Sequence, residues 1–200
     1  MKTIKKETRF LKVTGLETRA APDDAKSLML TGYAAKFNER SALLFGEFYE
    51  LIAPGAFARS LAETTVKALW NHNFDLVLGS TKSGTLRLEE DDVGLRMEID
   101  LPDNEWGRFA YDAVRRGDVD GVSFGFYVQD AEWIYLPDEG VHLRTLLDVD
   151  LFEISPTGFP AYTDSEVEAR SVMEAAGLMT KQARQAEMRK LLCDIHLMEV

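Results

Sequence analysis

Two long runs of strand-forming residues, 121–136 and 141–154, flank the turn sequence Pro137-Asp138-Glu139-Gly140. Both runs are rich in β-branched and aromatic residues, and the turn sequence has the right length and residue types to close a hairpin. The runs therefore predict a long antiparallel hairpin in which the numbers of facing residues add up to about 277.

The remainder of the chain also reads mainly as β structure. Short apolar-rich runs alternate with clusters of Asn, Asp, Gly and Ser, which is the punctuation of antiparallel strands. The expected strands are 10–13, 27–37, 66–70, 76–78, 85–88 and 93–101.

Two helices are expected among these strands. Phe57 and Leu61 are four residues apart and indicate a short helix that begins near Pro54. The clearest helix is predicted over 104–116, where an apolar stripe at helical spacing ends before Gly117. Helical spacing recurs from about residue 165 to 198, so we expect a β-rich domain over 1–163 and a C-terminal helical tail over 164–200.

Charge and composition exclude several classes of protein. The 200 residues carry 34 acidic and 23 basic side chains, a formal net charge of −11, which argues against a protein that binds nucleic-acid phosphates. A single cysteine, Cys193, excludes an intramolecular disulfide framework and a multi-cysteine zinc site. No apolar run approaches the ~18 residues of a membrane span, and the basic N-terminus lacks the apolar region of a signal peptide. A cytoplasmic protein is expected.

Reactive side chains stand among glycine, proline and aromatic residues in three short stretches, 70–73, 121–126 and 152–156. Taken singly, each has an ordinary structural interpretation. His72 can be a partly exposed residue at a strand end, Ser123 a small strand residue, and Glu153 a charge on the solvent face of a strand.

Taken together, the three side chains fit nucleophilic catalysis. A serine hydroxyl needs a base to remove its proton, and a carboxylate can orient the histidine that does so. The hairpin register places Ser123 opposite Glu153, Ile154 or Ser155, although a bulge could change which carboxylate or hydroxyl shares the face of Ser123.

Other reactive groups fit a structural role better. His142 lies ~12 residues along the hairpin from Ser123, a separation of tens of ångströms in a strand, and reads as a surface residue. Cys193 and His196 are three residues apart, a spacing that usually marks only one face of a helix. The acidic run 89–92 reads as a solvated turn, so no metal site is expected.

Several motifs, in this order along roughly residues 32–162, resemble the prohead maturation proteases of tailed phages. They are Gly32-Tyr33-Ala34 with Phe37, Glu50-Leu51-Ile52-Ala53-Pro54-Gly55-Ala56-Phe57, Leu69-Trp70-Asn71-His72-Asn73 with Leu78-Gly79, Gly84-Thr85-Leu86 with Gly94-Leu95, Gly121-Val122-Ser123-Phe124-Gly125-Phe126, and Glu153-Ile154-Ser155 with Pro160-Ala161-Tyr162.

The resemblance implies a serine endopeptidase related in fold to the herpesvirus assemblin proteases. The expected class is α+β, mainly β: a largely antiparallel β-barrel of assemblin type surrounded by helices. His72 matches the histidine of the family, Ser123 its serine, and Glu153 an acidic position taken as the third member, where assemblins use a second histidine. The backbone N–H groups of Phe124 and Gly125 are candidate oxyanion-hole donors, with the turn 115–117 as an alternative.

The resemblance also implies a role in capsid assembly. The enzyme is expected inside the assembling procapsid in the host cytoplasm, where it cleaves scaffold or the scaffolding part of the capsid protein, and also itself. No cofactor, nucleic acid or membrane is expected, and a homodimer is suggested by the assemblin relatives. The tail would be a packaging or self-cleavage segment, or a helix that packs on the barrel or on a second copy. The alternatives are a non-catalytic capsid assembly or scaffold protein with the same barrel, and a hydrolase of small esters.

Overall fold

The computed structural model describes residues 6–12, 16–21 and 24–158 of the chain. The strands are β1 (Lys6–Lys12), β2 (Glu17–Ala21), β3 (Asp24–Lys36), β4 (Phe48–Ile52), β5 (Lys67–Trp70), β6 (Asn73–Ser80), β7 (Leu86–Glu90), β8 (Gly94–Asp100), β9 (Gly121–Leu136) and β10 (Val141–Thr157). The helices are α1 (Ala58–Glu63), the 3-10 turn η1 (Thr81–Ser83) and α2 (Glu105–Arg116).

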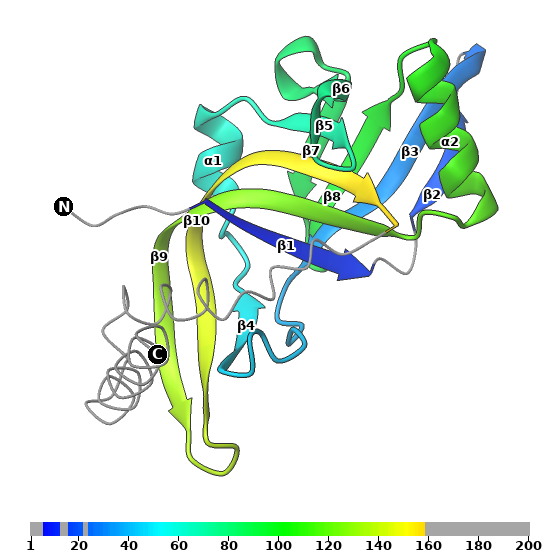
Figure 1. The fold of residues 1–200 in the computed structure, drawn as a ribbon. Coiled ribbons are helices and arrows are strands. Elements are labelled where there is room, and N and C mark those ends of the chain that lie inside the picture. Colours follow the sequence, from blue (N-terminus) through cyan, green and yellow to red (C-terminus); the bar gives the residue numbers. More distant parts are fainter. Residues whose placement is uncertain (1–5, 13–15, 22–23, 159–200) are drawn as a thin grey trace, which may run out of the picture. The chain divides into compact units, whose positions relative to one another are not determined.

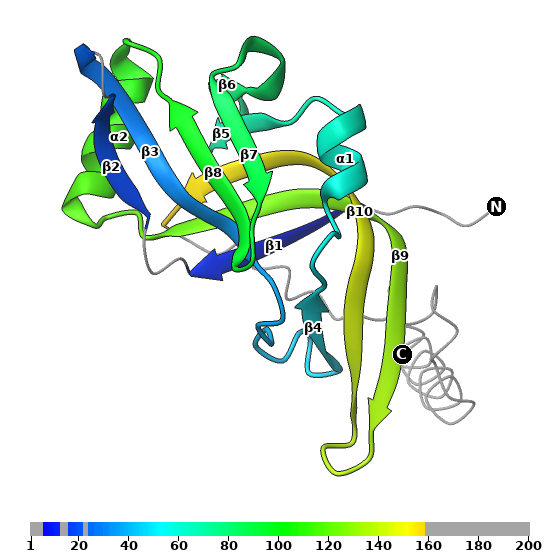
Figure 2. The same ribbon diagram turned by 180° about the vertical axis from the view of Figure 1, so that it is seen from behind.

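The described strands form two sheets. One has six strands in the order β1-β9-β10-β5-β6, with β4 also paired to β10, and the other has four in the order β2-β3-β8-β7. Figure 1 shows the β9–β10 pair bending between an arm flanked by β4 and a part flanked by β1 and β5, and Figure 2 shows the four-stranded sheet from its other side. The apolar faces of the two sheets form one core, which includes Leu30, Met97, Ile99, Phe124, Phe126 and Leu151.

The mainly β character is confirmed, and most pairings between the described strands are antiparallel, but these strands form two sheets and not one closed barrel. β10 pairs in parallel with both β4 and β5, so the six-stranded sheet is mixed. The cause is the length of β10: one of its edges holds β9, and the other holds β4 along the first half and β5 along the second.

The predicted hairpin is confirmed. It begins with Val141 opposite Leu136 and ends with Thr157 opposite Gly121, and it places Ser155 opposite Ser123, within the expected range. The pairing shifts at three places, one of them between Leu151 and Glu153, where a β-bulge gives the strand one extra residue. Most other expected strands are present, whereas β2 and β4 were not expected.

Helix α2 occupies the predicted position. The side chain of Asn104 accepts a hydrogen bond from the Gly107 N–H at 2.9 Å, and Gly117 ends the helix in the left-handed conformation. The helix buries its small residues, whereas Trp106 and Phe109 are about half exposed. Helix α1 begins at Ala58, four residues later than expected from Pro54.

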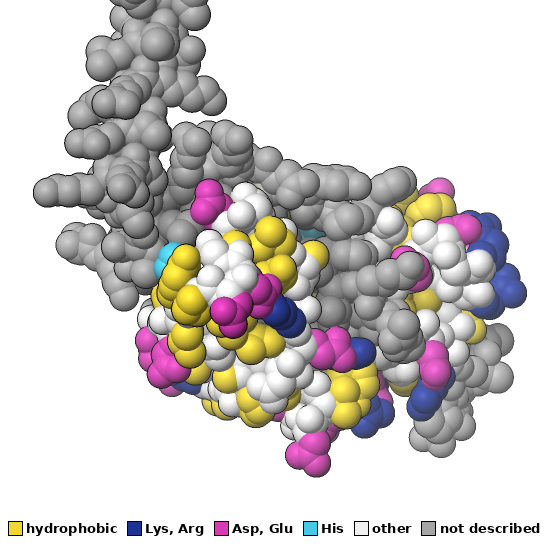
Figure 3. All heavy atoms as spheres, turned by 90° about the horizontal axis from the view of Figure 1, so that it is seen from below, with side chains coloured by type: hydrophobic (Ala, Val, Ile, Leu, Met, Phe, Trp, Pro, Cys, Tyr) yellow, Lys and Arg dark blue, Asp and Glu magenta, His cyan; other side chains and the backbone are white. Residues whose placement is uncertain are grey.

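None of the helices in the described part of the chain is long and apolar enough to cross a membrane. On the face shown in Figure 3, acidic, basic and hydrophobic side chains of the described residues are interspersed. The described residues of the body belong to one compact unit. The tail expected over 164–200, with Cys193 and His196, lies outside the described residues, so its helices stay a prediction.

Candidate active site

Ser123 lies near the start of β9, with strands on both sides. Its Cα pairs with Phe10 of β1 and with Ser155 of β10. Its neighbours in sequence, Val122 and Phe124, point into the core, so Ser123 points to the opposite face of the sheet. Directly opposed residues of antiparallel strands share a face, so Ser155 lies on the face of Ser123.

His72 is placed by a two-residue turn between β5 and β6. Asn71 and His72 both have positive φ, 50° and 59°, as a type I′ hairpin turn requires. This conformation is strained for residues other than glycine and persists only where the surroundings hold it. Here β10 holds the turn: Asn71 N–H donates to the Pro156 carbonyl, His72 N–H to Ser155 Oγ at 3.2 Å, and Thr157 Oγ1 to Asn71 Oδ1 at 2.6 Å.

Glu153 meets the imidazole of His72. Its Oε1 lies 2.8 Å from His72 Nδ1, and its Oε2 accepts a hydrogen bond from Ser155 Oγ at 2.6 Å. The carboxyl side chain is 2% exposed, whereas the histidine side chain is 26% exposed. Toward an ionised carboxylate Nδ1 must be the donor, and in the neutral imidazole the lone pair is then on Nε2. This is the tautomer that a general base needs.

The hydroxyl of Ser123 points toward β1 in this structure. It donates to the carbonyl oxygen of Arg9 at 2.9 Å, and the Ser123 side chain is buried. Nε2 of His72 is also buried and has no hydrogen-bond partner among the described residues. The structure thus brings His72 and Glu153 into contact and sets Ser123 on the same face, with its hydroxyl bonded elsewhere.

Gly125 gives Glu153 the room that it needs. The two residues are opposite each other in the β9–β10 pairing. A Cβ on Gly125 would stand 2.6 Å from Glu153 Oε1 and 2.5 Å from the Phe152 ring, closer than any such contact tolerates. The missing side chain is therefore a condition for the position of the carboxylate.

The candidate oxyanion donors all lie in hydrogen-bonded structure. Phe124 and Gly125 are inside β9, which has β1 on one side and β10 on the other, and the N–H groups of such a strand serve the ladders. In the alternative turn, the N–H groups of Gly117 and Asp118 bond the last carbonyls of α2.

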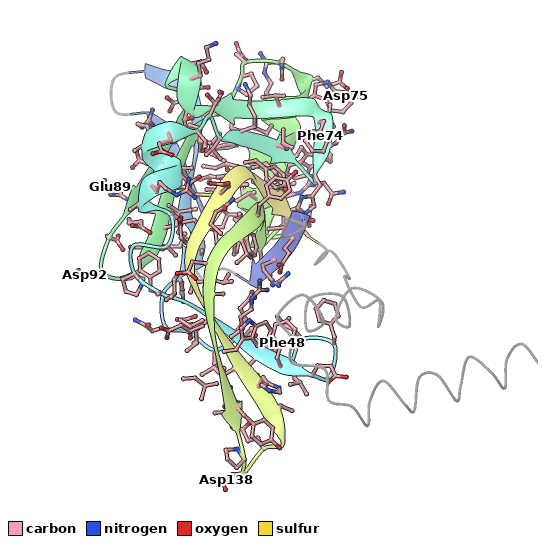
Figure 4. The ribbon with its side chains drawn as sticks, turned by 90° about the vertical axis from the view of Figure 1, so that its left-hand side faces the viewer. Phe48, Phe74, Asp75, Glu89, Asp92 and Asp138 are labelled. Carbon is pink, nitrogen blue, oxygen red and sulfur yellow. The ribbon has the colours of Figure 1, made fainter. Side chains whose placement is uncertain are left out.

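The remaining candidates lie away from these residues. His142 belongs to the hairpin arm, where its ring lies 5.1 Å from that of Tyr135. In Figure 4 the arm ends at Asp138, far from Phe74, which follows His72 closely in sequence.

In the acidic run 89–92, Asp91 serves as a turn acceptor. Its carboxylate accepts hydrogen bonds from Tyr33 Oη at 2.8 Å and from the N–H groups of Val93 and Gly94. The hydrogen bond from Tyr33, helped by those backbone bonds, lowers the pKa of Asp91 below its usual value.

Part of this network is not predicted by the sequence. The hairpin register predicts Ser155 only as a neighbour of Ser123, and no sequence pattern indicates the Arg9 carbonyl or the contacts of Asn71. Only Ser155 carried a local signal, through its place in the Glu153-Ile154-Ser155 motif.

Comparison with known proteins gives two findings. A family model described as caudovirus prohead serine protease matches residues 14–178. Among solved structures, the bacteriophage T4 capsid assembly protease, gp21, is similar with a TM-score of 0.49 and 10% sequence identity, over 76% of this chain and 99% of that one. Comparison with curated proteins gives no match.

Proposed function

The chain belongs to the caudovirus prohead serine protease family, and on this premise we propose that Ser123, His72 and Glu153 are the catalytic triad with which it cleaves peptide bonds. The protein is a serine protease of prohead maturation. The observation that supports the triad best is the contact between His72 Nδ1 and Glu153 on the sheet face that carries Ser123. In this pair the imidazole is oriented by a buried carboxylate, as a general base must be.

The reaction begins when the Ser123 side chain rotates about one bond, so that its hydroxyl leaves the Arg9 carbonyl and donates a hydrogen bond to His72 Nε2 instead. Nε2 takes the proton while Oγ forms a bond to the carbonyl carbon of the scissile peptide. The imidazolium then gives its proton to the leaving amine as the C–N bond breaks. Nε2 then takes a proton from water while the water oxygen forms a bond to the acyl carbon. The imidazolium returns this proton to Ser123 Oγ as the bond between the acyl carbon and Oγ breaks. Glu153 accepts from Nδ1–H throughout and stabilises the imidazolium.

The substrates that we propose are capsid and scaffold proteins, including the scaffolding part of the capsid protein. The enzyme would meet them inside the assembling procapsid, within the host cytoplasm. Self-cleavage, a homodimer, a tail that serves packaging or self-cleavage, and a fold relationship to the assemblin proteases are further parts of this proposal. All of them rest on what the family resemblance implies.

The first test is labelling with a fluorophosphonate. The Ser123 oxygen would displace fluoride from phosphorus while His72 takes the proton, and mass spectrometry of the digested protein would locate the adduct. We expect the adduct on Ser123 in the native chain and none in Ser123→Ala or His72→Ala. Ser60→Ala is the matched control, because Ser60 is also fully buried and its hydroxyl also donates to a backbone carbonyl of another element, that of Leu151.

The second test addresses the substrates. The chain is co-expressed with the capsid and scaffold proteins of its own phage, with and without Ser123→Ala. Cleavage of those proteins by the native chain alone is expected. Undiminished cleavage in the Ser123→Ala sample would contradict the mechanism, and an intact set of proteins in both samples would favour a non-catalytic assembly protein.

A further inference from the structure

We infer that Ser155 is a positioning residue that holds both Glu153 and the His72 turn in the arrangement that catalysis needs. This inference rests on the triad proposed above. Among the described residues, Ser155 is the one side chain that bonds both of these partners: its Oγ donates to Glu153 Oε2 at 2.6 Å and accepts from the His72 N–H at 3.2 Å.

The bond to Glu153 fixes the orientation of the carboxylate toward the imidazole. The Glu153 side chain ends in a planar group that can rotate, and the bond from Ser155 to Oε2 holds this plane so that Oε1 faces His72 Nδ1. Ser155 is fully buried, so water does not compete for its hydroxyl. A short bond from a neutral donor to a buried anion is among the stronger hydrogen bonds in proteins. It also satisfies an oxygen whose desolvation would otherwise be costly.

The bond from the His72 N–H fixes the strained turn. His72 has a φ of 59°, a conformation that is strained for a residue other than glycine and needs external support. Asn71 is held separately, by the Pro156 carbonyl and by Thr157. Ser155 thus supports the half of the turn that carries the imidazole, and one hydroxyl group aligns both sides of the Nδ1–Glu153 contact.

The same geometry argues that Ser155 is not the nucleophile. Its hydroxyl proton goes to Glu153, and it accepts from the backbone of His72 instead of facing a ring nitrogen. Nε2, the nitrogen that would take a proton from the nucleophile, has no partner among the described residues. Ser155 therefore acts through Glu153 and His72.

The test compares Ser155→Ala with Ser155→Cys, which keeps the shape of the side chain but is a weak donor. Rates are measured on co-assembled procapsid proteins and divided by the number of sites that a fluorophosphonate titrates. We expect kcat to fall about ten- to a hundredfold in Ser155→Ala and less in Ser155→Cys, with KM unchanged and the adduct still on Ser123. The downfield proton resonance of His72 Nδ1–H should shift or broaden, which a general loss of stability would not cause in the folded fraction.

Ser60→Ala again controls for the loss of a buried hydroxyl, and its kcat should equal that of the native chain. An unchanged kcat and resonance in Ser155→Cys would overturn the positioning role even if Ser155→Ala does not fold. If Ser123→Ala is inactive in the same assay, the proposed triad stands even when the positioning role of Ser155 is overturned. An adduct on Ser155 in the native chain would overturn the positioning role and the triad together.

Discussion

Gly125 and Glu153 show how little space the candidate site leaves at the scale of single residues. The carboxylate lies against the backbone of β9, where any side chain would displace it. It is also almost completely buried and bonded through both oxygens. Small changes at either residue should therefore act on catalysis before they act on the fold.

Gly125→Ala tests this close packing. The added methyl group would come too close to Glu153 Oε1 and to the Phe152 ring. Because the carboxylate moves more easily than the paired strands, we expect the carboxylate to be displaced. We expect a fall in kcat of at least tenfold and a loss of stability of about 1–3 kcal/mol. Enzyme kinetics and urea unfolding of the same sample measure the two effects. Full activity in a folded Gly125→Ala protein would contradict the role assigned to this space.

Glu153→Gln tests the carboxylate itself. An amide can donate to Nδ1, which would put the imidazole proton on Nε2 and leave no base for Ser123. We expect kcat to fall on the order of a thousandfold to ten-thousandfold, with the fold retained because the amide has the same shape. Asp150→Asn, a change on the same strand outside the triad, is the control. If Glu153→Gln keeps the kcat of the native chain, the third member of the catalytic triad is another residue.

Helix α2 is the element with the clearest sequence-encoded boundaries. The Asn104 side chain caps its first turn, and Gly117 ends it. Asn104→Ala removes the cap and should cost about 1 kcal/mol of stability. Asn104→Asp keeps an acceptor oxygen and should stay within a few tenths of the native value. Thermal or urea unfolding of the two variants measures the difference, and equal losses in both would show that the cap contributes nothing.

The elements differ in how far the sequence predicts them, for a physical reason. The β9–β10 hairpin and α2 depend on signals that stand next to each other in the chain, such as a turn sequence or a cap. The parallel pairing of β4 and β5 with β10 depends on contacts between residues about ninety apart, for which a local pattern carries no signal. The mixed sheet was therefore missed, although its longest strands were expected.

The candidate site divides in the same way. Motifs identify His72, Ser123 and Glu153, because chemistry restricts which residue types can stand there. The Arg9 carbonyl that accepts from Ser123 is a backbone group and leaves no mark in the sequence. The need for glycine at position 125 follows from the bulge at Phe152, which a hairpin register alone does not predict.

Four buried charged side chains join distant parts of the whole molecule. Arg9 of β1 bonds Glu50 of β4 at 2.6 Å, and Arg144 of β10 bonds Glu7 of β1 at 2.7 Å and Glu50 at 3.1 Å. Their charges balance, and each side chain is at most 11% exposed. Breaking such a network leaves an unpaired buried charge, which costs several kcal/mol. The cluster includes Arg9, whose backbone carbonyl accepts the hydrogen bond from the Ser123 hydroxyl.

Acid should weaken this cluster through Glu7. Burial alone would raise the pKa of the Glu7 carboxyl, but the hydrogen bond from Arg144 and the charges of Arg9 and Arg144 outweigh it and hold the pKa below its usual value of 4.5. The folded state therefore binds the Glu7 proton less readily than the unfolded chain. Its contribution to stability is complete above pH 4.5 and is lost as the pH falls through the lowered folded pKa.

Glu7→Gln isolates this contribution. Urea unfolding at several values from pH 7 down to pH 3 should give a free energy of unfolding that falls steeply with acid in the native chain and less steeply in the variant. The variant should also be less stable at neutral pH, on the order of 3 kcal/mol, because Arg9 and Arg144 then share one carboxylate. Glu17→Gln, which removes an exposed carboxylate paired with Arg19, controls for the change in net charge. Parallel curves for Glu7→Gln and the native chain would show that the cluster does not set the acid stability of the fold.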